Sequence, residues 1–178
     1  MKHLILFLTI SRVILSPILF LLIVVFNFYG ASLFIFVFAS ASDFLDGYLA
    51  RKFNLVTQIG EILDPVADKI LIVFVIIGVA LALNSAFIGF VGSMLLAREF
   101  WVATLRDFNS RNNNLSATKV TFLAKLKTTF QFLAFSGYLT GLYLDNAFIL
   151  FISNFILFLA LIITLQTGLS YTIASFKK

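Results

Sequence analysis

Most of the acidic residues lie in one stretch, which reads Asp43-Phe-Leu-Asp46-Gly47-Tyr-Leu-Ala50-Arg51 and, after eight residues, Gly60-Glu-Ile-Leu-Asp64-Pro-Val-Ala-Asp68. It holds five of the eight Asp and Glu residues in the sequence. Carboxylates are costly near lipid, so acids gathered at the ends of apolar segments indicate a functional site that faces a polar cavity. The rest of the chain is therefore expected to hold this site at a membrane boundary.

The surrounding sequence has the composition of an integral membrane protein. Of its 178 residues, 61% are hydrophobic and 12% are charged, and the mean hydropathy is +1.08. A soluble domain carries about twice that share of charge. At about 20 residues per spanning helix, roughly six helices use most of the chain. We expect one all-α membrane domain over residues 1–178, and the absence of cysteine excludes disulfides and thiol chemistry.

The basic residues predict the topology. The net charge is +5, which in a soluble protein would suggest nucleic-acid binding; here we expect no nucleic-acid partner. The breaks in the apolar runs near Asn27, Asn84 and Asp145 contain no Lys or Arg, whereas the other breaks and both ends are basic. By the positive-inside rule, both termini and the site face the cytoplasm, in the cytoplasmic membrane of a bacterium.

The apolar runs predict the helices. A short interfacial helix over residues 4–12 is expected to lead into the first span, and Pro17 then falls in the first turns of that span, where helices tolerate proline. The expected spans cover residues 13–28, 31–51, 59–83, 86–108, 120–143 and 147–173.

Helical spacing turns the acidic stretch into a candidate metal site. Asp43 and Asp46 share one stripe of their helix, and Asp64 and Asp68 share one stripe of the next. Two antiparallel helices joined by a short turn would bring the four carboxylates together, where they need compensating cations. Hard divalent ions prefer oxygen ligands, and four Asp could hold two Mg²⁺ or Mn²⁺ ions, the usual clamp for displacement at phosphorus.

Small residues accompany these acids. Gly47, Ala50 and Gly60 lie on the same stripes and would let a bulky phosphorylated ligand approach the backbone, and Arg51 could pair with a phosphate. Structural salt bridges, or an ion path in a transporter, are the alternatives. Four acids at these spacings favour the metal site.

The complete pattern from Asp43 to Asp68 resembles the signature of the CDP-alcohol phosphatidyltransferase family. The resemblance implies a six-helix membrane enzyme, usually a homodimer, whose aspartates bind two divalent cations. It implies that Gly47, Ala50, Arg51 and Gly60 help to seat the CDP moiety and that Asp68 is the general base. The implied reaction is attack of an alcohol on the lipid-side phosphorus of CDP-diacylglycerol, with CMP as the leaving group.

Basic residues outside the stretch indicate the acceptor. Arg98 and Arg106 are eight residues apart on one helix stripe, and Lys125 and Lys127 open the next helix on the same side. Thr9 and Arg12, near the start of the chain, could complete a basic rim. Bases gathered beside a metal site suit an acceptor that carries its own phosphate.

Each of these bases taken singly is more typical of a topology anchor. Arg98 differs because apolar runs flank it, and it therefore requires a partner; the candidates are Glu99, Asp107 and a ligand phosphate.

Three further segments, 97–99, 105–107 and 125–131, resemble the branch of the family that uses glycerol 3-phosphate. We therefore expect glycerol 3-phosphate as the acceptor. Serine, inositol phosphate and phosphatidylglycerol are the alternatives within the family. Outside it, the competing hypothesis is a small cation or proton-coupled transporter.

Overall fold

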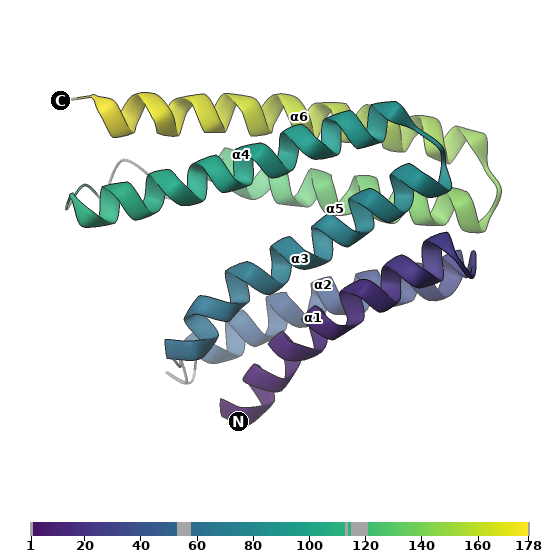
Figure 1. Ribbon diagram of the computed structural model, residues 1–178, viewed down its shortest axis with the longest axis horizontal. Coiled ribbons are helices and arrows are strands. Elements are labelled where there is room, and N and C mark those ends of the chain that lie inside the picture. Colours follow the sequence, from purple (N-terminus) through teal and green to yellow (C-terminus); the bar gives the residue numbers. More distant parts are fainter. Residues whose placement is uncertain (1, 53–57, 113, 115–120, 178) are drawn as a thin grey trace.

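The computed structural model is all-helical (Figure 1). It describes the backbone of residues 2–52, 58–112, 114 and 121–177, and the side chains of residues 8–42, 63, 66–112, 114 and 121–177. The elements are α1 (Lys2–Val24), α2 (Tyr29–Lys52), α3 (Gln58–Ala82), α4 (Ala86–Arg111), α5 (Phe122–Tyr143) and α6 (Ala147–Phe176).

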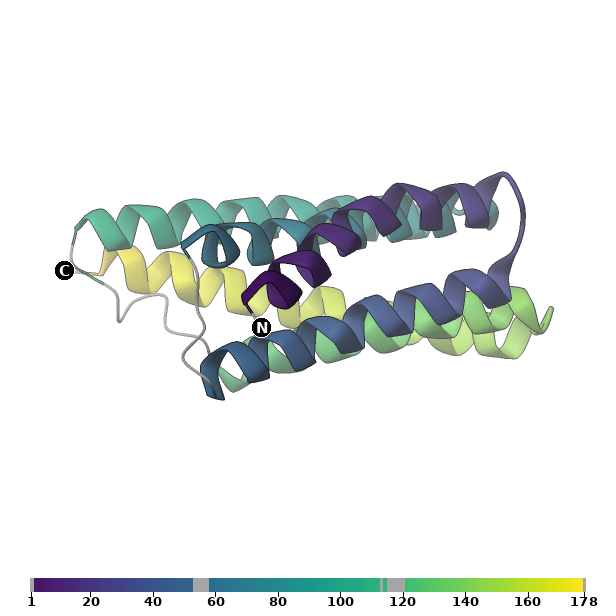
Figure 2. The ribbon, with the colours of Figure 1, turned by 90° about the horizontal axis from the view of Figure 1, so that it is seen from below.

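Three short turns, α1–α2, α3–α4 and α5–α6, lie at one end of the bundle, and both termini lie toward the other (Figures 1 and 2). Each turn holds one residue in the left-handed region: Asn27 at φ 54°, Asn84 at φ 45° and Asp145 at φ 49°. Asn and Asp adopt this conformation more readily than other non-glycine residues. The side chains of Ser85 and Asn146 then cap the helices that follow.

The packing divides the bundle into two groups joined through α3 and α5. α1 packs against α2 and α3, α6 packs against α4 and α5, and α5 also contacts α2 and α3. Gly137 and Gly141 let α5 approach α6, because a Cβ at either position would overlap Ser153 or Leu150 of α6. The small-residue pattern at 137 and 141 therefore serves helix packing within the chain.

The distribution of side chains is that of a protein in lipid. Large apolar residues such as Phe34 (72% exposed) and Phe148 (70% exposed) cover the outside, whereas Arg12 and Lys127 are buried. Soluble proteins rarely expose apolar surface on this scale. Among the described residues, α4 and α6 are each long and apolar enough to span a bilayer.

The N-terminal segment differs from the expectation. A single uninterrupted α1 begins at Lys2, so residues 4–12 form its first part and not a separate interfacial helix. Pro17 consequently lies in the interior of α1 and not in its first turns. Proline inside a helix removes one backbone hydrogen bond.

Candidate active site

Asp68 lies on α3. Of the four aspartates predicted to form the cluster, it is the one whose side chain the structure describes. Its side chain is 47% exposed, and its Oδ1 accepts a hydrogen bond from Nη1 of Arg12, which is fully buried on α1. A buried guanidinium requires an anion, and Asp68 supplies it. Thr9, one turn before Arg12, is also buried. The structure thus places Thr9 and Arg12 on the α1 side of Asp68 and not with the bases of α4 and α5.

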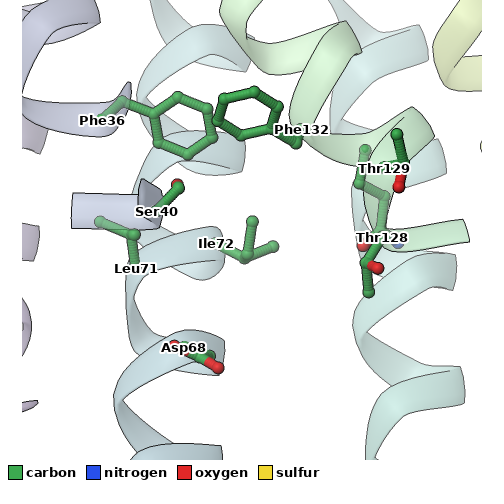
Figure 3. A pocket seen from close by; sticks show the side chains of 9 residues that line it. Phe36, Ser40, Asp68, Leu71, Ile72, Thr128, Thr129 and Phe132 are labelled. Atoms are coloured by element: carbon green, nitrogen blue, oxygen red, sulfur yellow. The ribbon is translucent and has the colours of Figure 1, made fainter. Parts of the chain in front are cut away.

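An apolar cavity of about 410 Å³ lies between α2, α3 and α5. Phe36 and Phe132 stack on one side of it, with ring centroids 5.5 Å apart, and Leu71 and Ile72 form part of its wall. Asp68 lies on the side away from the two rings (Figure 3). One carboxylate therefore borders a space that is otherwise suited to hydrocarbon.

A basic cavity of about 300 Å³ lies between α3, α4 and α5. Its charged lining residues are Lys69, Arg98, Glu99, Arg106, Lys125 and Lys127. The structure therefore brings together the four bases predicted on α4 and α5. It adds Lys69, which we did not predict as a site residue. A helix turns by about 100° per residue, so Lys69 points toward α4 while its neighbour Asp68 borders the apolar cavity.

The bases of the basic cavity fall into two kinds. Arg106 and Lys125 are exposed, and neither makes an ion pair with any residue in the described part of the chain. Lys127 is buried and forms an ion pair with Glu99. The exposed pair is available to an anion, whereas Lys127 already has a carboxylate partner.

Arg98 is held mainly by α6. Its Nε donates to the carbonyl oxygen of Thr164 at 3.2 Å, its Nη2 donates to Oγ1 of Thr167 at 2.8 Å, and its Nη1 donates to Glu99 at 3.2 Å. Gly168 leaves room for the aliphatic part of Arg98, because a Cβ there would lie 3.1 Å from its Cγ. Arg98 therefore lines the basic cavity as a residue fixed by a neighbouring helix.

Two candidate partners of Arg98 are now distinguished. Glu99 is confirmed as one partner. Asp107 instead pairs with Arg111 on the exposed side of α4, with 2.8 Å between the charged atoms.

Tyr171, also on α6, lies beside Arg98 and the start of α5. The Arg98 guanidinium lies 5.7 Å from the centre of its ring, and its hydroxyl accepts a hydrogen bond from the backbone N–H of Thr121, the N-cap of α5. No residue of α6 was predicted from the sequence to belong to the site. The available signal was a helical stripe of Thr164, Thr167, Gly168 and Tyr171 in an apolar segment.

A third cavity, of about 230 Å³, shares lining residues with both of the others. It is lined by Asp68 and Gln131, which also line the apolar cavity, and by Glu99, Arg106 and Lys127, which also line the basic cavity. We call it the junction cavity. Asp68 thus lines the apolar cavity and the junction cavity, and the junction cavity in turn shares lining residues with the basic cavity.

The other predicted site residues lie on α2 and α3, and their side chains are outside the described part of the structure. They are Asp43, Asp46, Gly47, Ala50 and Arg51 on α2, and Gly60 and Asp64 on α3. Their convergence with Asp68 stays a prediction.

A profile of the CDP-alcohol phosphatidyltransferase family matches residues 3–166. The chain belongs to this family. Members of the CDP-alcohol phosphatidyltransferase family use divalent metals, and the carboxylate of Asp68 offers the oxygen ligands that such ions prefer.

The chain is also similar over nearly its full length to individual members of this family. It is 39% identical to the CDP-diacylglycerol–glycerol-3-phosphate 3-phosphatidyltransferase of Rickettsia typhi, over 96% of each chain. It is 33% identical to the proteins of the same name from Escherichia coli and Shigella flexneri, over 94% of this chain and 92% of theirs.

Proposed function

We propose that this protein transfers the phosphatidyl group of CDP-diacylglycerol to glycerol 3-phosphate, releasing CMP and forming phosphatidylglycerophosphate. The observation that carries the proposal is that Asp68 lines the apolar cavity and also the junction cavity, whose other lining residues include bases of the basic cavity. The reaction joins a lipid to a small phosphate ester, and it requires those two environments on either side of the reacting groups. The names of the relatives supply the same pair of substrates.

The lipid substrate would lie across α2, α3 and α5. The apolar cavity offers Phe36 and Phe132 to hydrocarbon, while Gly47, Ala50, Arg51 and Gly60 would seat the CDP moiety. Asp43, Asp46, Asp64 and Asp68 would hold two divalent cations, Mg²⁺ or Mn²⁺, which supply neutralisation of the diphosphate charge.

Asp68 would also accept the proton of the attacking hydroxyl. The hydrogen bond from Arg12 occupies Oδ1 and fixes the orientation of the carboxylate. The hydroxyl that becomes the new ester then displaces CMP from the lipid-side phosphorus without a covalent enzyme intermediate.

The phosphate of the acceptor would bind in the basic cavity. Arg106 and Lys125 are exposed on its wall and would contact the phosphate, while Arg98 and Lys127 add positive charge from buried positions. Oriented bases in a partly enclosed space bind phosphate more strongly than the same bases in open water.

The remaining proposals concern the assembly. All six helices would cross the cytoplasmic membrane of a bacterium as one domain, with both termini and the cavities on the cytoplasmic side. This is supported by the absence of Lys and Arg from the three short turns. As is usual in this family, the protein would be a homodimer.

The deciding experiment is an acceptor panel. Purified protein in detergent, with CDP-diacylglycerol and Mg²⁺ or Mn²⁺, should release CMP chiefly with glycerol 3-phosphate. Preference for serine, inositol phosphate or phosphatidylglycerol would reassign the acceptor. Cation or proton flux in vesicles without any CMP release would favour a transporter.

A further inference from the structure

Among the described charged residues that line the basic cavity, Glu99 is the acid and the others are bases. It lies on α4, its side chain is 26% exposed, and it lines both the basic cavity and the junction cavity. A negative charge at this position weakens the attraction of the cavity for a phosphate. Phosphate binding alone therefore does not explain why an acid lies at this position.

The two carboxylate oxygens of Glu99 differ in their contacts. Arg98 Nη1 and Lys127 Nζ both donate to Oε1. Oε2 has no hydrogen-bond partner among the residues that the structure describes. A carboxylate serving only as a counter-ion could share both oxygens between two cations. Here one oxygen fixes the side chain and the other is left as an acceptor beside the cavities.

The position of Glu99 matches the middle of the acceptor. In glycerol 3-phosphate, the phosphate and the reacting primary hydroxyl are at opposite ends, and a second hydroxyl lies between them. If the phosphate lies in the basic cavity and the reacting hydroxyl lies near Asp68, the second hydroxyl must pass through the junction cavity, which Glu99 lines.

We propose that Glu99 determines specificity by accepting a hydrogen bond from the second hydroxyl of the acceptor, an inference that rests on the proposed function. Arg98 and Lys127 hold the carboxylate in place through Oε1, so Oε2 is oriented before the acceptor arrives. The basic cavity thus selects the phosphate, and Glu99 selects the hydroxylated carbon next to it.

The test compares two acceptors that differ by this one hydroxyl. Glycerol 3-phosphate and 3-hydroxypropyl phosphate share the phosphate and a primary hydroxyl, and only the first has the second hydroxyl. A hydrogen bond to a charged group corresponds to a preference of about tenfold to a hundredfold in kcat/KM. The wild-type protein should show this preference, and Glu99→Ala should reduce it to within about twofold of unity.

Two further variants separate specificity from a structural role. Glu99→Gln keeps an oxygen that accepts hydrogen bonds, so part of the preference should return. Arg106→Ala should weaken the use of both acceptors and leave their ratio unchanged, because the ion pairs of Glu99 are with Arg98 and Lys127, and Arg106 serves the phosphate. Loss of activity in Glu99→Ala with both acceptors in the same proportion would show that Glu99 is structural.

The ratio also distinguishes this inference from the proposed function. Equal use of the two acceptors by the wild-type protein, or an unchanged ratio in Glu99→Ala and Glu99→Gln, would overturn the role of Glu99 alone. CMP release with serine and with neither phosphate acceptor would overturn the proposed function and this inference together.

Discussion

Thr167 tests whether α6 positions the acceptor site. Its Oγ1 accepts a hydrogen bond from Arg98 Nη2 at 2.8 Å, and both side chains are buried. Thr167→Val keeps the branched shape but removes the hydroxyl, leaving one N–H of a buried cation without a partner. A hydrogen bond to a charged group contributes about 1.5–3 kcal/mol.

The lower end of this range applies, because Arg98 keeps its bonds to Thr164 and Glu99. About 1.5 kcal/mol corresponds to roughly a tenfold change in an equilibrium constant. We expect KM for glycerol 3-phosphate to rise about tenfold in Thr167→Val, with KM for CDP-diacylglycerol changed less than about twofold, since Arg98 lines the basic cavity and not the apolar one.

Both KM values are measured by CMP release, and two variants serve as controls. Thr167→Ser restores the hydroxyl and should recover nearly wild-type KM for glycerol 3-phosphate. Ser170→Ala removes an exposed hydroxyl on the same helix, which donates only to the carbonyl of Gln166, and should change neither constant. An unchanged KM for glycerol 3-phosphate in Thr167→Val, or equal increases in both KM values, would refute the proposed positioning by α6.

Three other predictions follow from the same structure. Arg106→Ala should raise KM for glycerol 3-phosphate about tenfold or more by removing an exposed phosphate contact, whereas Arg111→Ala, outside the cavity, should not; equal effects of the two variants would contradict this. Asp68→Asn should abolish CMP release, and so should complete chelation of divalent metal from the wild-type protein. Added Mg²⁺ or Mn²⁺ should restore CMP release in the chelated wild-type sample and not in Asp68→Asn. CDP-lipid binding by Asp68→Asn should persist, and surviving turnover would exclude Asp68 as the base. Gly92→Ala should destabilise the protein by about 1–3 kcal/mol in thermal unfolding, because the added Cβ would overlap α3. Gly89→Ala meets no neighbouring atom and should unfold no more easily than wild type.

The helices could be predicted from the sequence with small errors at their ends. Apolar runs of membrane-spanning length and turns marked by Asn27, Asn84 and Asp145 are local features, so they are visible without the fold. The continuation of α1 through residues 4–12 was missed because Arg12 and Thr9 interrupt the apolar run. In the structure, burial beside α3 and the ion pair with Asp68 allow Arg12 to lie within the helix.

The sequence by itself determined the class of protein and the family, because the acidic stretch has fixed spacing along two adjacent helices and the apolar composition admits few alternatives. It also predicted that Arg98, Arg106, Lys125 and Lys127 lie close together, with Thr9 and Arg12 completing the set; the first four line one cavity, whereas Arg12 pairs with Asp68. Only the tertiary structure decided what each base contacts. Arg98 meets α6 across more than 60 residues of sequence, and such pairings depend on how the helices pack. For the same physical reason, the open oxygen of Glu99 and the lining residues that the cavities share became visible only once α3, α4 and α5 were placed together.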